Sequence, residues 1–543
     1  MALTIILIYL AIAVFIGVFS TRFLRKTGSD FFVASRSMGP FVLLMSLFST
    51  NMTAFAILGS SGETYKKGIG VFGLMASSSA LIIPCVLFFV GTRLWSIGKK
   101  FGYVTQVRYF RDRWESNTLG TVIFVVLVFF SAPYILTGLL GGETIFAKLT
   151  GYPQEYKWVG SLVLCVVVCI YTFLGGMRGA NWVQTFQAIL LLTFGALGFV
   201  AITRELGGFG TIMEQIQASP RASHLLAREG EISTWKFLSY TLIPLSVGMF
   251  PHMFIHLLTA KKLTAFRYTF VFYPLCIATV WLPSVLLGLI AFHQNPSLRT
   301  AAETNGALVE LYHNYAGTLL AGLFGAGVCA AIMGSLDSHI LCLGSMFTQD
   351  VVVHYGMIDD RNEKTKVLVA RSFVVALLLT VFLLIRFVDA RTIFSTGVWC
   401  FSAFSSLFPL LLAAVFWRRS TKLGAYLSTL TVLLLVSFFY CLADYGANDE
   451  YTITWTGLQN LGTQINNLVK GIPNKTIAPQ DGIMPVMLIL PISALVLLIG
   501  SLVSRPPSDK TLERFFPGKR GDFAAMPSID GQAGEPISTP AKI

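Results

Sequence analysis

Chemically active side chains gather in one apolar stretch of this 543-residue chain. The stretch AAIMGSLDSHILCLGSMF (330–347) carries Ser335, Asp337 and His339 between flanks that are almost wholly apolar. An apolar environment strongly penalises polar groups that lack a partner. These side chains are therefore expected to hold an ion, a solute or one another.

Asp337 and Ser335 cannot serve the same ion from one helix face, because they point about 200° apart on an ideal helix. Ser335 shares its face with residues three, four and seven positions later, which are Ser338, His339 and Cys342. Asp337 is open to three interpretations. It is a hydrogen-bonded structural or gating carboxylate, a proton-linked or accessory cation site, or a direct contact with a solute.

A second pair of titratable residues, His252 and His256, lies four positions apart and so on one helix face. Such a pair suggests zinc in general. No acidic or cysteine ligand is near it in the sequence, so we do not expect zinc. His252 follows Pro251, and it is a candidate for solute contact or titration, with a hydrogen bond between helices as the structural alternative.

The elements that position these residues are apolar segments long enough to cross a membrane. The chain is 54% hydrophobic and 12% charged, against about 25% charged in soluble domains. About thirteen windows of roughly 20 residues are apolar, which predicts an all-α polytopic membrane protein. The segments of a β-barrel would alternate and be about half as long. The windows are 2–20, 40–61, 70–95, 118–147, 158–175, 180–203, 236–258, 268–293, 315–350, 367–388, 392–417, 422–442 and 483–503.

The net charge of +13 also fits a membrane protein. Lys and Arg concentrate in alternate loops and in the tail, which places the N-terminus outside and the C-terminus inside. The basic residues are too dispersed for a nucleic-acid surface, so the expected partner is the lipid bilayer. The 8 cysteines lie in or beside apolar segments without metal-ligand spacing.

Two apolar segments are interrupted in corresponding ways. One contains SLFSTNMTAFAILGSSGE (46–63), and the other contains SYTLIPLSVGMFPHMFIH (239–256). Helix breaks in a membrane survive only where they are buried in protein or line a wet cavity. Five segments counted from each break give two sets of opposite orientation. This pattern predicts a transporter built from inverted repeats, with its site at the midplane.

The predicted organisation is one membrane domain with six parts. They are an N-terminal helix and loop (1–39), a first five-helix repeat (40–203), an external loop (204–235), a second inverted repeat (236–417), two C-terminal helices (418–503) and a disordered cytoplasmic tail (504–543).

Three motifs resemble the sodium:solute symporter family. They are residues 31–63, the signature GGMRGANWVQTFQ (175–187), and the opening stretch as far as MFTQD (346–350). The resemblance implies a LeuT-type fold of the APC superfamily with five-plus-five inverted repeats and discontinuous helices. It also implies sodium-driven import of a small organic solute across the plasma membrane (in a bacterium, the inner membrane). Sodium would be transported rather than held as a cofactor, and the protein would not be an enzyme.

The resemblance also implies a sodium site between the first broken segment and the stretch at 330–347. Backbone carbonyls would come from Ser49, Met52 and Ala331, and side chains from the positions of Gly334 and Ser335. The family usually has two hydroxyl residues at the latter pair, and here the first is glycine. Sodium is a hard cation that prefers oxygen ligands. A water or the hydroxyl of Thr53 is the expected replacement.

Gln184 is a second departure from the family, which commonly has Thr-Asp where this chain has Val183-Gln184. That carboxylate is associated with an inner exit path or an additional sodium site. A glutamine can act as a ligand but carries no charge. We therefore predict one sodium per solute, with Gln184 and Asp337 as gating or accessory cation residues.

The solute pocket is expected beside the two breaks. Half-helix N-termini attract anionic groups, so the predicted solute is an organic acid, an amino acid or a vitamin-like compound. Proton-coupled symport is the main alternative, and a passive facilitator or channel is the next. The sequence predicts neither the identity of the solute nor the oligomeric state. The expected wall residues are Thr53, Phe55, Ser78 with its neighbours Ser77 and Ser79, Tyr240, Met249, His252 and Trp399, with Ser402 as a further candidate.

Overall fold

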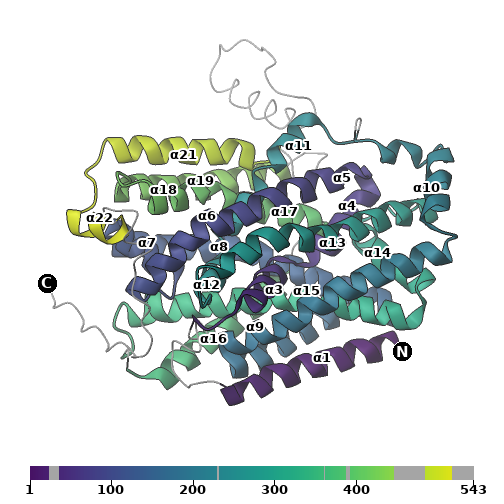
Figure 1. The fold of residues 1–543 in the computed structure, drawn as a ribbon, viewed down its shortest axis with the longest axis horizontal. Helices are drawn as coiled ribbons and strands as arrows, with labels where there is room; N and C mark the ends of the chain where they lie inside the picture. Colours follow the sequence, from purple (N-terminus) through teal and green to yellow (C-terminus); the bar gives the residue numbers. More distant parts are fainter. Residues whose placement is uncertain (24–35, 229–230, 360, 387–391, 445–482, 517–543) are drawn as a thin grey trace, which may run out of the picture.

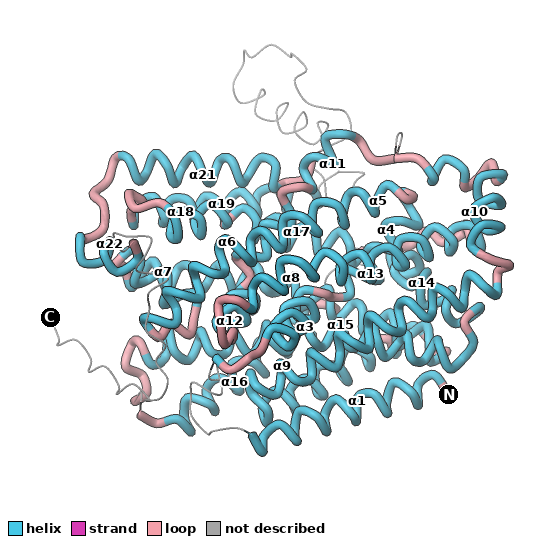
Figure 2. Tube along the Cα trace, in the orientation of Figure 1, coloured by secondary structure: helices cyan, strands magenta, loops and turns pink. Residues whose placement is uncertain are grey.

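The protein is a bundle of membrane-length helices. The computed structural model describes residues 1–23, 36–228, 231–359, 361–386, 392–444 and 483–516. Within these ranges the chain is almost entirely helical (Figure 2). The β-bridge given for the described residues joins Met38 to Ala260. The described residues include 10 helices long and apolar enough to cross a membrane, and 2 bent helix pairs that bring the number to 12. The all-α prediction is confirmed, whereas the count of thirteen stays a prediction.

The helices have the following bounds. They are α1 (Ala2–Phe19), α3 (Pro40–Asn51), α4 (Ser60–Lys67), α5 (Gly70–Phe72), α6 (Ser78–Phe101), α7 (Gln106–Trp114), α8 (Asn117–Thr150), α9 (Trp158–Glu205), α10 (Phe209–Ala218), α11 (Thr234–Tyr240), α12 (Pro251–Leu258), α13 (Ala265–Gln294), α14 (Ala301–Tyr315), α15 (Gly317–Met346), α16 (Glu363–Leu384), α17 (Ile393–Ser406), α18 (Phe408–Phe416), α19 (Lys422–Asp444), α21 (Val486–Leu502) and α22 (Asp509–Phe515). Short 3-10 helices are η1 (Ser20–Phe23), η5 (Gln154–Tyr156), η6 (Ser223–Leu226) and η7 (Ile243–Gly248), and π-helices are η3 (Phe55–Gly59), η4 (Gly73–Ser77) and η8 (Phe347–Val353).

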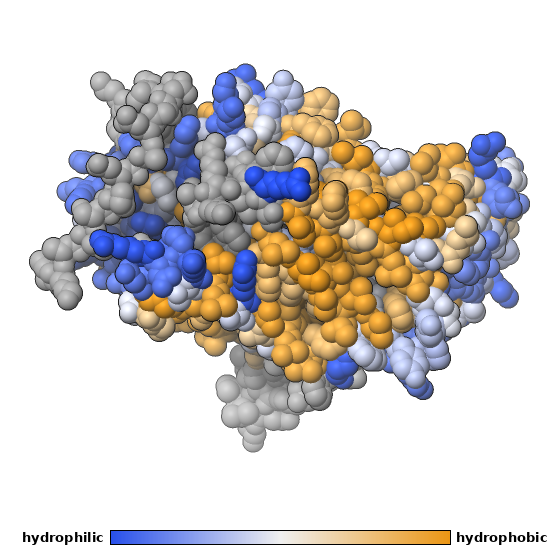
Figure 3. Space-filling model, turned by 90° about the horizontal axis from the view of Figure 1, so that it is seen from below, coloured by the Kyte–Doolittle hydropathy of each residue, from blue (hydrophilic) through white to orange (hydrophobic). Residues whose placement is uncertain are grey.

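The long helices run side by side along the long axis of the molecule (Figure 1). The N-terminus, α10 and α14 lie at one end, and α7 and α22 lie at the other. Seen from below, an apolar belt separates two hydrophilic ends (Figure 3). This arrangement is the one expected of a bundle of helical spans that cross a bilayer. Which end faces the cytoplasm stays a prediction.

The expectation of a disordered tail from residue 504 is wrong for the part that the structure describes, because residues 509–515 form the helix α22. This short helix docks on α7 through Phe515, which is fully buried and lies 5.4 Å from Tyr109 between ring centroids. Arg514 of α22 pairs with Asp112 of α7 at 3.2 Å. The tail therefore finds aromatic partners that its own composition does not reveal. Residues 517–543, like loop residues 445–482, lie outside the described residues.

Both predicted breaks are present. The helix pair Pro40–Asn51 and Phe55–Lys67 is bent by 63°, and the pair Thr234–Gly248 and Pro251–Leu258 by 51°. In the first pair Met52 adopts an extended conformation, with ψ 115°. In the second, Pro251 begins α12 at the position where a missing N–H costs nothing. A backbone link ties the two pairs together, since Met38 N donates to Thr259 O at 3.1 Å.

The long helix α9 is also interrupted, at the two glycines that begin the motif 175–187. Gly176 has φ 54° and ψ −159°, a conformation that only glycine adopts readily. The interruption divides α9 into two apolar spans, Gln154–Met177 and Gly179–Glu205. Gly17 of α1 packs against Tyr171 at this junction. The glycine pair therefore sets the angle between two helices of the first repeat.

Replacing Gly176 with alanine is expected to destabilise the fold by about 1–3 kcal/mol, because a Cβ strains this backbone conformation. Gly195→Ala in the same helix is the matched control. No atom lies within 4 Å of a Cβ built there, and alanine favours helix. The midpoint of thermal unfolding in detergent checks both. A Gly176→Ala protein as stable as Gly195→Ala would contradict this assignment.

Candidate functional site

A small cavity, the central cavity, lies between the two breaks. Its volume is about 40 Å³, and it is lined by Phe55, Tyr240, Phe250, Trp281 and Phe401 among others. Polar groups come from Asn51, Ser79 and Ser246 in the same wall. Ligand pockets usually measure about 300–1,000 Å³, so this cavity holds little more than water. Its walls must separate before an organic molecule can enter.

The predicted wall residues divide into two groups. Phe55 and Tyr240 line the cavity, and Ser79 does so in place of Ser78, whose hydroxyl donates to Leu74 O at 3.1 Å. Thr53 turns its oxygen to the backbone N–H of Phe55 at 3.1 Å. It therefore caps the second half of the broken helix.

Met249 and His252 are fully buried outside the cavity wall. The Met249 carbonyl accepts a hydrogen bond from Gln106 Nε2 of α7 at 3.2 Å. This contact joins the second break to the end of the bundle that carries α7.

Trp399 lines a different and larger cavity of about 380 Å³, whose walls are almost wholly apolar. This cavity lies between α8, α16, α17 and α19. Trp399 and Phe401 of α17 therefore line different cavities, because Phe401 lines the central cavity. A rotation of 200° between positions two apart on a helix accounts for the difference.

Trp281 is the main wall residue that sequence reasoning missed. Its indole N–H is buried and has no hydrogen-bond partner among the described residues. It lies mid-helix in α13, in an apolar run without a motif, so the sequence carried no signal for it. In the cavity wall it offers one donor to an acceptor group.

The predicted sodium ligands are all buried, and two of them, Ser49 and Gly334, are in contact at the first break. A Cβ built on Gly334 would overlap Ser49 Oγ and lie 3.5 Å from the Ser49 carbonyl oxygen. The end of α3 and the middle of α15 are therefore in direct contact at this glycine. Met52 lines the central cavity beside this contact. Ala331 and Ser335 lie three residues before and one residue after Gly334 along α15.

Asp337 belongs to a second cluster, on the side of α15 that faces α9. Its carboxylate accepts from Gln184 Nε2 at 2.7 Å and from Tyr171 Oη at 3.0 Å. Ser338 joins this cluster instead of the Ser335 face, because its hydroxyl contacts Gln184 and lies 2.8 Å from His256 Nε2. Every hydrogen-bond partner of Asp337 in the described chain is neutral. A fully buried carboxyl in such surroundings is either protonated or neutralised by a bound cation.

A pair of buried histidines connects α12 to α15. His339 Nδ1 lies 2.6 Å from His252 Nδ1, so one of the two nitrogens carries a proton and the other accepts it. Tyr134 of α8 stacks on His339 with 4.6 Å between ring centroids, and its hydroxyl donates to Thr50 O at 3.1 Å. His252 and His256, which lie four positions apart, thus contact different partners. The contact between His252 and His339 joins α12, which follows the second break, to α15.

An ion pair closes the bundle at the end that carries α7. Arg111 donates to the backbone oxygen of Asp350 at 2.7 Å, and its guanidinium lies 3.5 Å from the Asp350 carboxylate. Both side chains are buried. Burial lowers the pKa of Arg111, while the Asp350 carboxylate acts in the opposite sense. The pair fastens α7 to η8, the continuation of α15.

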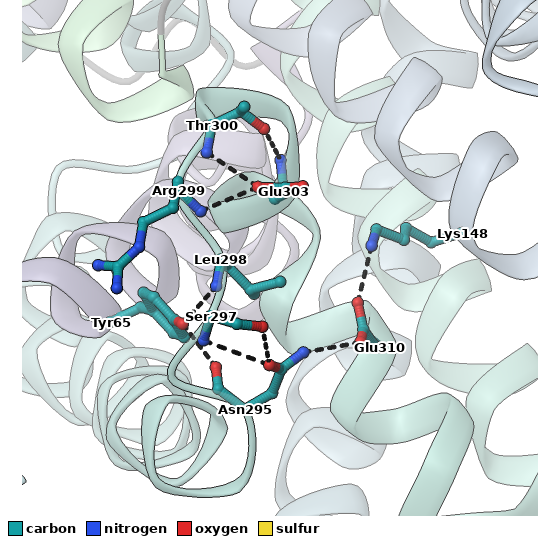
Figure 4. A network of polar contacts seen from close by, with 9 residues as sticks. All are labelled: Tyr65, Lys148, Asn295, Ser297, Leu298, Arg299, Thr300, Glu303 and Glu310. Atoms are coloured by element: carbon teal, nitrogen blue, oxygen red, sulfur yellow. Dashed lines mark hydrogen bonds and ion pairs between the residues drawn. The ribbon is translucent and has the colours of Figure 1, made fainter.

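A polar network closes the opposite end (Figure 4). Tyr65 at the end of α4 donates to Asn295 O at 2.5 Å and accepts from Leu298 N at 3.1 Å. Glu310 of α14 accepts from Asn295 at 3.4 Å and from Lys148 of α8 at 2.7 Å. The second half of the broken helix is thereby tied to α14 and to the loop that precedes it.

Comparison with known proteins gives one consistent family. A profile described as Sodium:solute symporter family matches residues 31–432. The sodium/proline symporter of Escherichia coli (strain K12) is 25% identical over 437 residues, which are 76% of this chain and 83% of that protein. The sodium/pantothenate symporter of the same strain is 23% identical over 430 residues, 77% of this chain and 86% of that protein.

A solved structure shows the fold independently. The substrate-bound outward-open state of a Na⁺-coupled sialic acid symporter superposes with a TM-score of 0.71 at 16% identity. The superposition covers 93% of this chain and 98% of that chain.

Replacing Arg111 with alanine is expected to destabilise the protein by about 3–5 kcal/mol, because the buried Asp350 carboxylate loses its cation. Arg108→Ala, an exposed position on the same helix, is the control and should change stability by less than about 0.5 kcal/mol. Thermal unfolding in detergent measures both. Equal stability of the two variants would show that Arg111 carries no ion pair of consequence.

Proposed function

The chain belongs to the sodium:solute symporter family, and we propose that it imports a small carboxylate-bearing solute together with one sodium ion by alternating access. As a family member it is a multi-pass transporter of the plasma membrane and not an enzyme. Its described chain has the LeuT-type fold of such symporters. The solute class, the ion site and the stoichiometry are the parts proposed here.

The observation that carries the sodium proposal is the contact between Ser49 and Gly334. The carbonyl oxygen of Ser49, at the end of α3, faces the segment of α15 that contains Ser335. A helix break leaves carbonyl groups without their helical partners, and such oxygens replace the water around an alkali cation. Met52 and Ala331 would add two further carbonyl oxygens, and Ser335 a hydroxyl.

The central cavity supports a carboxylate-bearing solute. Its wall contains no charged side chain and combines aromatic rings with the free Trp281 donor. The cavity adjoins the start of α12, and helix N-termini favour anionic groups. Proline, pantothenate and sialic acid, the solutes named for three relatives, all carry a carboxylate. We propose an organic acid, an amino acid or a vitamin-like acid for this chain.

Asp337 favours one alternative, proton-coupled symport. A buried carboxyl with only neutral partners can exchange a proton or hold a second cation during transport. Gln184, which donates to Asp337 at 2.7 Å, supplies no compensating charge. The two couplings differ in the gradient that drives uptake.

Sodium is expected to raise the melting temperature of the purified protein, because a ligand that binds the folded state stabilises it. Ser335→Ala should weaken the sodium dependence about tenfold, which corresponds to about 1.4 kcal/mol for one lost oxygen ligand. Ser345→Ala is the control, since its buried hydroxyl on the same helix has no partner among the described residues. The same assay, run with candidate acids, identifies the solute. A sodium shift that persists unchanged in Ser335→Ala would refute the ion site.

Uptake into proteoliposomes separates the two couplings. We expect a sodium gradient alone to drive uptake, with a Hill coefficient near one for sodium, and a proton gradient alone to be ineffective. Asp337→Asn, which imitates the protonated carboxyl in shape, should retain most of the sodium-driven uptake. Uptake driven by protons and abolished in Asp337→Asn would support the alternative instead.

A further inference from the structure

Gly334 leaves the proposed sodium site short of one oxygen, and a third helix fills the space that it vacates. A Cβ built on Gly334 would lie 2.9 Å from Gln187 Oε1, as well as overlapping Ser49 Oγ. Gln187 belongs to the second half of α9. A hydroxyl-bearing side chain at the position of Gly334, as other family members have, would thus point to the space beside the Gln187 amide oxygen.

The Gln187 oxygen is available for a ligand. Gln187 is fully buried, and its Oε1 atom has no hydrogen-bond partner among the described residues. A buried amide oxygen without a partner is costly, and a cation bound beside Gly334 would satisfy the Gln187 oxygen. The hydroxyl of Thr53, the other candidate, already accepts from Phe55 N.

The orientation of the amide follows from its neighbours on α1. Tyr9 donates its hydroxyl hydrogen to Met333 Sδ at 3.7 Å and so presents its oxygen to Gln187 Nε2 at 3.2 Å. With the nitrogen directed to Tyr9, the carbonyl oxygen faces Gly334 and Ser49. Helix α1, which lies outside both repeats, therefore holds the amide in place.

We propose that Gln187 Oε1 is a sodium ligand that compensates for the missing hydroxyl at Gly334. This inference rests on the proposed function. It gives the site oxygens from three helices, which are α3, α15 and α9. The α9 contribution couples sodium binding to the helix that also carries Gln184, and through Tyr9 to α1. An amide oxygen is a suitable ligand for a hard cation.

The test is a sodium titration of the purified full-length protein at constant ionic strength, with choline as replacement and the melting temperature as readout. Gln187→Ala should raise the half-saturating sodium concentration about tenfold, or about 1.4 kcal/mol. Asn181→Ala is the matched control. It is a buried amide on the same helix, and neither of its polar side-chain atoms has a partner among the described residues.

Compensation distinguishes a ligand from a structural amide. Gly334→Ser alone should bind sodium more weakly, because its Cβ meets the Gln187 oxygen. The double variant Gly334→Ser with Gln187→Ala should recover affinity, since the serine then has room and supplies a hydroxyl. Gln187→Glu should keep sodium binding and make it pH-dependent, and it decides the matter if Gln187→Ala does not fold.

Two results would overturn the proposal. One is wild-type sodium affinity in Gln187→Ala, or in Gln187→Glu without pH dependence. The other is an equal loss in Gln187→Ala and Asn181→Ala. If the wild type itself shows no sodium-specific shift, the proposed function fails; if its shift depends on Ser335 but not on Gln187, only this inference fails.

Discussion

The break in the first repeat helix is the constraint on which the rest of the structure depends. Backbone groups freed at Met52 cannot be left facing lipid, because no water is present there to bond them. They must be enclosed by neighbouring helices, and α15 is the principal one. Among the long apolar spans of the described residues, the span that contains α15 is the second most buried, with 83% of its 18-residue apolar window buried inside the protein. Small residues make this possible, since Gly334 admits Ser49 and Gly138 admits Ile332.

Enclosure of the break explains why α15 carries so many polar residues. One side of the helix meets α3 through Gly334, and another meets α9 through Asp337 and Gln184. A third contact reaches the second broken helix, where His339 bonds His252. A polar side chain is costly alone in an apolar interior, and Asp337 and His339 are tolerated there because neighbouring side chains bond to them. The helix therefore connects both breaks.

The central cavity is small, and contacts between helices also close the bundle at its two ends. At one end, Arg111 fastens α7 to the continuation of α15, and α22 adds an aromatic clasp on α7. At the other end, Tyr65 and Glu310 tie the broken helix to α14. Alternating access requires that these closures release at different times. Both closures include polar contacts between helices, and a ligand shifts such an equilibrium only by as much as it binds one state better than the other.

The sequence by itself determined the helical class, both breaks and the separation of Asp337 from Ser335. Bilayer thickness fixes the length of an apolar segment, and helix geometry fixes angles within one helix. Tertiary structure alone decided which side chains of different helices meet. In the folded protein Trp281 lines the central cavity, whereas Trp399 lines a different one. Residues 509–515 form α22, and the Gln187 side chain lies beside Gly334. The rotation of each helix about its axis follows from the packing of all its neighbours, and no local pattern records that rotation.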